Sequence, residues 1–309
     1  MTTDTSEIVW RPTPDIVERA RITRLMRANG LRSLGELQKR SIDDTEWYWN
    51  AVVHDLGIRW TRPYTRVLDD SRGPAWPAWF PGGLLNLADN CLDRHLDAGR
   101  ADRPALVWEA DDGQTRTLTY RELAREVNRL GNALKRLGIA EGDRVGVFLP
   151  MAPEAAIATL AIARIGAVYT PCFSGFGAQA VASRLQDCEA KLLITADGFH
   201  RRGQVVRMKE TADEAVAACP SIRRVLVYRR LGRDIPWTAG RDHWWTTVPR
   251  CRWTPTAPAS SSTPRAPPAA PRAPCSPTRA SSSRRRTTSP TATTSARAIA
   301  SSGSPISDG

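Results

Sequence analysis

The sequence predicts an α/β protein: a helical region comes first, then a mainly parallel β-sheet covered by helices, and then a disordered tail. Residues 119–172 alternate helix, strand, helix and strand with short connections, which is typical of a parallel sheet with helices on its faces. Residues 251–309 consist almost wholly of Ala, Pro, Ser, Thr and Arg. Such a segment cannot bury enough apolar surface to offset its conformational entropy, so we expect it not to fold.

The first 70 residues are mostly helical in pattern. Helices are predicted over 15–29, 33–39 and 43–56, and Gly30 and Gly57 stop the first and the third. Five tryptophans lie in or after these helices: Trp47, Trp49, Trp60, Trp76 and Trp79. Two interpretations stand, because these side chains either anchor a small region on a larger body or simply fill a core.

The next elements lead up to the central stretch. In order they are a loop (74–83), a helix (84–96) and two antiparallel strands (105–109 and 115–119) joined by a turn at Asp112-Gly113. The helix that follows has clear ends, because Thr119 and Glu122 form a Thr-x-x-Glu capping box and Gly138 stops it.

The chain then alternates strands and helices. The predicted elements are a strand (144–149), a buried helix from Pro153 to about Gly166, a strand (167–172), a helix (177–185), a strand (191–195), a helix (203–219) and a strand (224–228). This alternation is expected to persist to about Val248.

Composition favours a cytoplasmic protein with reduced thiols. No hydrophobic segment near the start resembles a secretory signal, and the most apolar run, 155–163, is too short to span a bilayer. The six cysteines show no C-x-x-C pair and no metal-ligand spacing, so we expect neither a metal site nor a disulfide framework. The net charge of +12 is uneven, since residues 251–309 carry eight Arg and one Asp while the first 250 residues carry only +5.

Seven short motifs occur in the same order as in a known family. They are Trp79–Asn86 (WFPGGLLN), Asn90–His95 (NCLDRH), Thr119–Leu123 (TYREL), Gly142–Val145 (GDRV), Leu149–Met151 (LPM), Ala163–Ala167 (ARIGA) and Phe173–Phe176 (FSGF). Together these motifs resemble the N-terminal part of an acetyl-CoA synthetase-like acyl-CoA synthetase, an AMP-dependent, adenylate-forming ligase. The resemblance covers about residues 8–248. It implies a helical N-terminal extension (1–90), an incomplete AMP-binding (adenylation) domain (91–248) and a low-complexity tail (249–309).

The resemblance implies a reaction and also a missing part. Such enzymes join a carboxylic acid to ATP, with Mg²⁺, as an acyl-adenylate and then pass the acyl group to CoA. The chemistry needs a phosphate-cradling loop rich in Ser, Thr and Gly with a Lys, which the family has soon after the position of Val248. Residues 251–309 contain no Lys. We therefore expect this chain, as written, to lack ATP binding and activity; no catalytic residue is assigned, and the acid remains open because the acyl pocket lies beyond the break.

One binding turn is expected to remain. Residues 196–204 align with a family loop that contacts the nucleotide part of CoA, and the resemblance assigns this contact to Arg201, Arg202, Gly203 and Gln204. Gln204 stands where the family usually has a basic residue. The alternative interpretation is a solvated basic turn that caps the next helix.

Two rival functions are retained. The first is a non-catalytic CoA-binding module that uses the same turn. The second is nucleic-acid binding through Arg284-Arg285-Arg286, which has no interleaved aromatic residues and rests on the tail alone. The four histidines accompany no recognisable nucleophile signature, so ordinary surface or capping roles are expected for His54, His95, His200 and His243.

The tail is consistent with a displaced reading frame. If each codon takes the last base of one triplet and the first two of the next, the junctions from Ser262 to Thr278 permit Tyr-Thr-Ser-Gly-Thr-Thr-Gly-Arg-Pro-Lys-Gly-Ala-Val-Leu-Thr-His. This is the missing phosphate loop. Residues 297–309 permit a second family-like stretch. The sequence therefore predicts a frameshift between about Val248 and Arg252, which is either a real mutation or a sequencing error.

Overall fold

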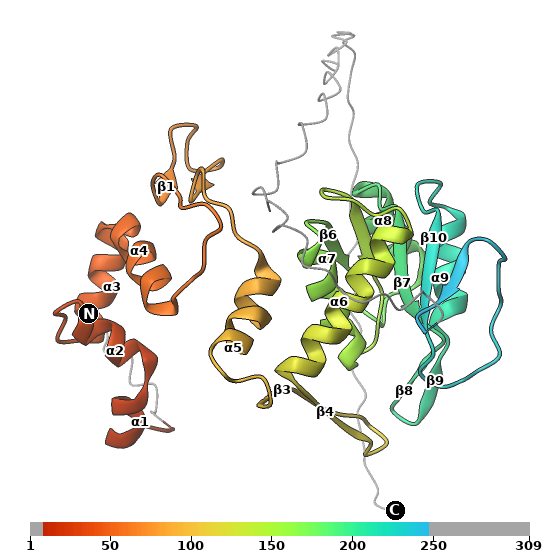
Figure 1. The fold of residues 1–309 in the computed structure, drawn as a ribbon, viewed down its shortest axis with the longest axis horizontal. Helices are drawn as coiled ribbons and strands as arrows, with labels where there is room; N and C mark the ends of the chain where they lie inside the picture. Colours follow the sequence, from red (N-terminus) through yellow and green to blue (C-terminus); the bar gives the residue numbers. More distant parts are fainter. Residues whose placement is uncertain (1–8, 247–309) are drawn as a thin grey trace, which may run out of the picture. The chain divides into compact units, whose positions relative to one another are not determined.

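A computed structural model of the chain describes residues 9–246. Its first region contains four helices (Figure 1): α1 (Pro14–Arg19), α2 (Arg21–Ala28), α3 (Leu34–Asp43) and α4 (Thr45–Leu56). The prediction of one helix over 15–29 is wrong, because the extended backbone of Ala20 (ψ 136°) separates α1 from α2. The Ser33 hydroxyl accepts the Glu36 N–H at the start of α3, and Gly57 (φ +58°) ends α4 as predicted.

Two predictions for the connecting segment need correction. The predicted loop contains β2 (Ala78–Trp79), which pairs antiparallel with β1 (Leu68–Asp69). The predicted helix over 84–96 begins late, because Leu84 forms a β-bridge with Arg62. The helical turns are then η1 (Asp89–Asp93), a π-helix, and α5 (Arg94–Asp97). The Asn86 side chain accepts the Ala88 N–H at 2.9 Å, which marks the turn into the helix.

The hairpin and the helix that follow agree with prediction. β3 (Pro104–Glu109) and β4 (Thr115–Thr119) are antiparallel and lead into α6 (Tyr120–Arg136). The capping box is complete: the Glu122 N–H donates to Thr119 Oγ1 at 3.2 Å, and the Thr119 N–H donates to Glu122 Oε2 at 2.9 Å.

The main sheet has five parallel strands in the order β11-β10-β7-β5-β6, which confirms the predicted fold class. The strands are β5 (Arg144–Val147), β6 (Val168–Pro171), β7 (Leu192–Ala196), β10 (Arg224–Tyr228) and β11 (Asp242–Trp244). The helices α7 (Pro153–Arg164), α8 (Ala178–Asp187) and α9 (Met208–Ala217) connect them, with α6 packed on α7 and α8 on α9 (Figure 1). The sequence did not predict β11.

Packing around the sheet is close. β7 is buried along its whole length, and a Cβ on Gly146 of β5 would lie 2.3 Å from a Leu185 methyl carbon of α8. Since that contact leaves no room for a side chain, α8 can pack directly on the backbone of β5.

The prediction of a helix over 203–219 is wrong at its start. Residues after β7 form a hairpin of β8 (Phe199–Arg201) and β9 (Gln204–Val206), and α9 begins only at Met208. The two turn residues, Arg202 (φ +51°) and Gly203 (φ +74°), are both left-handed, as a two-residue hairpin turn requires.

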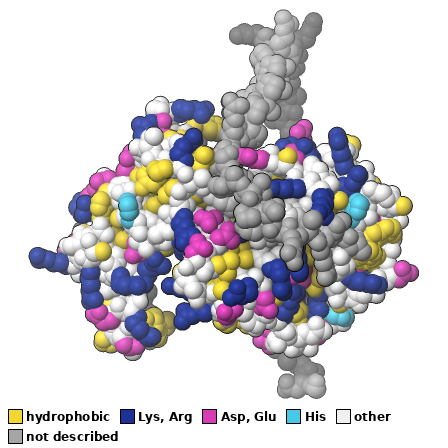
Figure 2. Space-filling model, in the orientation of Figure 1, with side chains coloured by type: hydrophobic (Ala, Val, Ile, Leu, Met, Phe, Trp, Pro, Cys, Tyr) yellow, Lys and Arg dark blue, Asp and Glu magenta, His cyan; other side chains and the backbone are white. Residues whose placement is uncertain are grey.

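Several predictions lie outside the described residues. These concern the disordered tail, the displaced frame and the nucleic-acid hypothesis, all of which fall on residues 249–309. On the face drawn in Figure 2, Lys and Arg side chains are interspersed with Asp and Glu over the described part of the chain. None of the helices between residues 9 and 246 combines the length and apolar character needed to cross a membrane. The same residues contain no group of three or more His, Cys, Asp or Glu placed to hold a metal ion.

Candidate functional site

The predicted CoA turn lies at the carboxyl edge of the parallel sheet. β5 lies between β6 and β7, so the chain steps to one side of β5 and then returns to the other. In open α/β sheets, ligands bind outside the carboxyl ends of the strands, beside such a reversal. The loop after β6 and the β8–β9 hairpin after β7 both leave the sheet at this edge.

Arg201 meets an exposed aromatic side chain from the other loop. The carbon at the centre of its guanidinium lies 5.6 Å from the ring centroid of Phe173, which is 56% exposed. A Cβ on Gly175 would lie 2.6 Å from the Phe173 ring and 2.8 Å from Arg201 Nη1. A side chain at position 175 would displace one or both of these groups, so glycine permits this approach, and the structure joins two motifs that the sequence treated separately.

A second arginine–phenylalanine pair extends this group. The Arg184 guanidinium lies 4.3 Å from the centroid of Phe176, and the rings of Phe173 and Phe176 meet edge to face with centroids 5.6 Å apart. Among the described residues, no carboxylate forms an ion pair with Arg201 or Arg184. We call these four residues the Arg–Phe cluster. It can hold a ligand that combines a flat ring with anionic groups.

The other predicted site residues lie at the hairpin tip. Gln204 pairs with Arg201 across the hairpin, while Arg202 and Gly203 form the turn. The turn does not cap the next helix, because β9 intervenes and the N-cap of α9 is Arg207, without a side-chain cap bond. The capping part of the alternative is therefore wrong, while all four predicted residues are exposed to solvent, as that alternative has them. Of the four, Arg201 is the one that belongs to the Arg–Phe cluster.

A buried carboxylate next to the hairpin holds the loop after β10 in place at the carboxyl edge of the sheet. Asp197, fully buried directly after β7, accepts the backbone N–H groups of four residues after β10: Arg230 at 2.8 Å, Leu231 at 3.1 Å, Gly232 at 2.7 Å and Arg233 at 3.2 Å. These bonds satisfy the buried charge and tie the loop after β10 to the loop after β7. Sequence reasoning missed this role, although an aspartate directly after a buried strand was the available signal.

Two titratable groups near this edge, the Cys172 thiol and the Tyr228 hydroxyl, are neutral at pH 7. Burial raises the pKa of the Cys172 thiol to about 11. Burial, with the neighbouring Glu154 carboxylate, raises the pKa of Tyr228 to about 12. Neither group can serve as an anionic nucleophile or base there, so the arrangement is suited to binding.

Comparison with known families defines the class of protein. Residues 92–278 match the family model described as AMP-binding enzyme, which is more than half of the chain, and the chain belongs to this family. Residues 34–91 match the model of the acetyl-coenzyme A synthetase N-terminus. The predicted resemblance is thereby confirmed, while the predicted division at residues 90 and 248 stays a prediction.

Individual relatives agree with this assignment. The chain is 47% identical over 219 residues to an acetyl-coenzyme A synthetase of Mycolicibacterium smegmatis, covering 71% of this chain and 23% of that relative. It is 39% identical over 231 residues to a 3-hydroxypropionyl-coenzyme A synthetase of Sulfurisphaera tokodaii, covering 74% and 35%. The structure of an acetoacetyl-CoA synthetase from Streptomyces lividans superposes with a TM-score of 0.71 at 33% identity, covering 79% of this chain and 38% of that one. The match thus spans only 23–38% of the length of these relatives.

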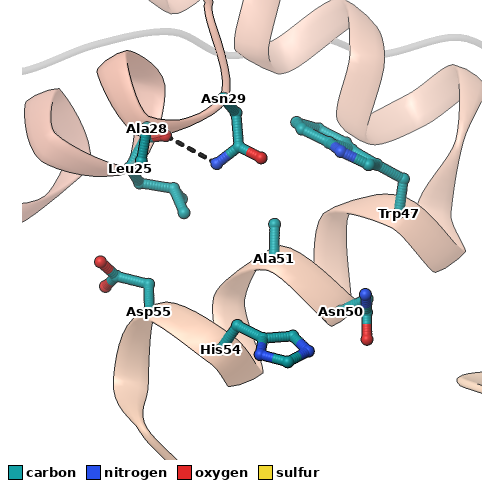
Figure 3. A pocket seen from close by; sticks show the side chains of 8 residues that line it. All are labelled: Leu25, Ala28, Asn29, Trp47, Asn50, Ala51, His54 and Asp55. Atoms are coloured by element: carbon teal, nitrogen blue, oxygen red, sulfur yellow. Dashed lines mark hydrogen bonds between the residues drawn. The ribbon is translucent and has the colours of Figure 1, made fainter.

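A separate hollow in the helical region is a packing feature. It has a volume of about 330 Å³, and in Figure 3 the side chains of Leu25 and Ala51 point toward each other across it. Two of its polar side chains are bonded within the helical region: Asn29 donates to the Leu25 carbonyl at 2.8 Å, and Asp55 pairs with Arg21 at 2.6 Å.

Proposed function

We propose that this chain carries the CoA-contacting part of an acid–thiol ligase of the acetyl-CoA synthetase type. The observation that carries the proposal is Arg201 over the exposed ring of Phe173, beside a glycine that keeps the approach open. The intact reaction would convert a short or medium carboxylic acid, ATP with Mg²⁺ and CoA to acyl-CoA, AMP and pyrophosphate. A cytoplasmic setting is in keeping with the free thiols of Cys91, Cys172, Cys188 and Cys219.

The residues present fit the nucleotide part of CoA. That group offers an aromatic base and several phosphates, which match an exposed phenylalanine face and arginines without carboxylate partners in the described region. Arg201 would bind a phosphate beside the stacked base, and Arg202 would add positive charge from the hairpin tip. Asp197 acts indirectly, because it holds the loop after β10 against the base of the hairpin.

CoA affinity tests this role. Titration calorimetry with CoA should show binding to the unchanged chain, and Arg201→Gln should weaken it by roughly tenfold to a hundredfold, the usual loss for a charged hydrogen bond. Arg202→Asn is a sharper variant, since Asn favours the left-handed turn and so preserves the hairpin while removing the charge. The matched control is Arg223→Gln, an exposed arginine that precedes β10 at the opposite end of the strand. Unchanged affinity in both hairpin variants would refute the assignment.

We further propose that the 309-residue chain does not itself complete the ligation. The support is the absence of Lys from residues 251–309, where the family's phosphate loop is expected. A pyrophosphate-release assay with acetate, ATP and CoA should therefore detect no turnover. Robust turnover would overturn this claim, whereas CoA binding without turnover is the behaviour of the non-catalytic CoA-binding module.

We also propose that the tail is read in a displaced frame. The codon junctions between Ser262 and Thr278 permit the complete phosphate loop, including its Lys. Resequencing the DNA that encodes residues 245–255 tests this directly. An uninterrupted frame, with no family motif in the neighbouring frame, would eliminate the hypothesis.

A further inference from the structure

A long loop at the carboxyl edge is held in place from both sides. Residues 229–241 connect β10 to β11 without a helix or strand of their own. Long structured loops of this kind are usually functional. Asp197 fixes the first part through the N–H groups of residues 230–233, and the fully buried Lys209 donates to the Pro236 carbonyl at 3.0 Å.

The anchor at Lys209 is itself part of a buried charge network. Its ammonium lies 2.7 Å from Asp213 and 2.9 Å from Asp242, which begins β11. The loop is therefore tied to α9 and to the edge strand by bonds that would be costly to break. A loop constrained in this way can present a binding surface without losing much conformational entropy when a ligand binds.

The anchored loop surrounds a hollow of about 380 Å³, which we call the Trp237 pocket. Its main lining residues are Arg229, Arg233, Asp234, Ile235, Trp237 and Trp244. The indoles of Trp237 and Trp244 are stacked, with centroids 4.7 Å apart and planes 22° apart. Trp237 is still 41% exposed, so the stack ends in an open aromatic face. The volume is suited to a small organic ligand.

One cation in the pocket is available for a ligand. Arg233 is already paired with Glu210 at 2.7 Å. Arg229 lies with its guanidinium 5.3 Å from the Trp244 ring, and within residues 9–246 it forms no ion pair with a carboxylate. Asp234 also lines the pocket, and both it and Arg229 are exposed to solvent, so water screens the two charges alike. The site therefore combines an open aromatic face with a guanidinium that forms no ion pair with a carboxylate of the described residues.

We propose that the Trp237 pocket binds a planar aromatic anion, an aryl carboxylate or aryl phosphate. The ring would stack on Trp237, and the anionic group would form a charge-assisted pair with Arg229. This site is separate from the Arg–Phe cluster, because it uses the loop between β10 and β11 and none of the residues of the hairpin. A ligand there would also stabilise the loop and the edge strand β11.

The test is ligand-observed NMR and calorimetry on the full chain with 2-naphthoate and 1-naphthyl phosphate as probes. Saturable binding of either probe is expected, and the pair distinguishes a carboxylate from a phosphate ligand. Cyclohexanecarboxylate, which lacks the ring, and 2-naphthalenemethanol, which lacks the charge, should each bind at least about tenfold more weakly.

Two variants locate the site. Arg229→Gln and Trp237→Ala should each weaken probe binding by about tenfold or more, while Arg223→Gln should leave it unchanged. Far-UV circular dichroism checks that each variant is folded. Because Arg229 is exposed, Arg229→Gln still tests the proposal if Trp237→Ala does not fold. The proposal is overturned if neither probe shows saturable binding, or if Arg229→Gln binds as the unchanged chain does. It is also overturned if Arg201→Gln lowers probe affinity equally, because the probe would then occupy the Arg–Phe cluster.

Discussion

The helices α1–α4 and the parallel-sheet region are held together in different ways. In α1–α4, Leu25 and Leu37 are the buried apolar side chains, whereas every residue of β7 is buried. Many apolar side chains of the helical region stay exposed: Ile16, Val17, Ile22, Leu34, Ile42, Trp49 and Leu56. Since apolar burial is the main favourable term in folding, the sheet region should supply most of the stability.

One pair of contacts shows why distance alone does not measure an interaction. Lys39–Asp43 in α3 and Lys209–Asp213 in α9 are both Lys–Asp pairs four residues apart, at 2.5 and 2.7 Å. The side chains of the first pair are 77% and 57% exposed, while Lys209 is 0% exposed. Water screens the first pair, whereas the buried Lys209 ammonium is removed from water and depends on its protein partners.

The largest difference is expected when each lysine is replaced by methionine. Lys209→Met removes one of the two cations that bind the buried Asp242, leaving only Arg241, and should lower the free energy of unfolding by about 3 kcal/mol. The matched variant Lys39→Met should cause no resolvable change, because its pair lies in water. Urea denaturation followed by circular dichroism measures both. Equal shifts for the two variants would show that burial does not decide the strength of these pairs.

The next comparison concerns the apolar cores. Leu193→Ala in the centre of β7 should cost about 2–5 kcal/mol, because it opens a cavity where the surroundings cannot collapse. Leu37→Ala removes one of the two buried apolar side chains of α1–α4 and should release this region locally. Hydrogen exchange should therefore rise throughout the sheet in the first variant and only within residues 14–57 in the second. If β7 exchanges as fast in Leu37→Ala as in Leu193→Ala, the helical region and the sheet region are not separately stabilised.

These contrasts also explain which parts of the fold could be predicted. The capping box at Thr119 and the strand–helix–strand order over 144–172 carry their signals in local sequence, and the structure confirms them. The break at Ala20 carries no Gly or Pro signal. β11 depends on pairing with β10 and on the buried Lys209, both distant in sequence. Local patterns contain no record of such contacts.

The candidate site divides in the same way. The hairpin turn with Arg201 could be found by its resemblance to a family loop. Its partner Phe173 could not, because β6 and β7 flank β5 and bring their loops together only in three dimensions. The Asp197 anchor and the Trp237 pocket likewise join residues from the ends of different strands. Motif resemblance identifies the hairpin side of such a site, with Arg201, whereas the side that holds Phe173 is known only once the strand order is known.

Acid should act on the sheet region through Asp242. Burial raises the pKa of this carboxyl, but hydrogen bonds from Arg241, the Thr238 N–H and Lys209 outweigh burial and hold the pKa below its ordinary value. The stabilisation is complete above the unfolded pKa of about 3.9 and is lost as pH falls through the lower folded value. The urea concentration at the midpoint of unfolding, measured from pH 7 downward, should therefore decrease once the pH is below about 4. Asp242→Asn should be less stable at pH 7 and show a shallower fall; an unaltered acid profile would exclude this role.

The smallest expected effects come from the helix caps, and they test whether the two regions are independent. Thr119 caps α6 against the sheet, and Ser33 caps α3 in the helical region. Replacing either by Ala should cost about 1 kcal/mol, since each loses the same kind of side-chain bond to a backbone N–H. The cost of Thr119→Ala should appear in the main unfolding transition, whereas that of Ser33→Ala should appear only as faster hydrogen exchange in α3 and its neighbours. If both variants shift the main transition equally, the helices and the sheet unfold as one cooperative unit, and the weak core of α1–α4 is stabilised by the rest of the chain.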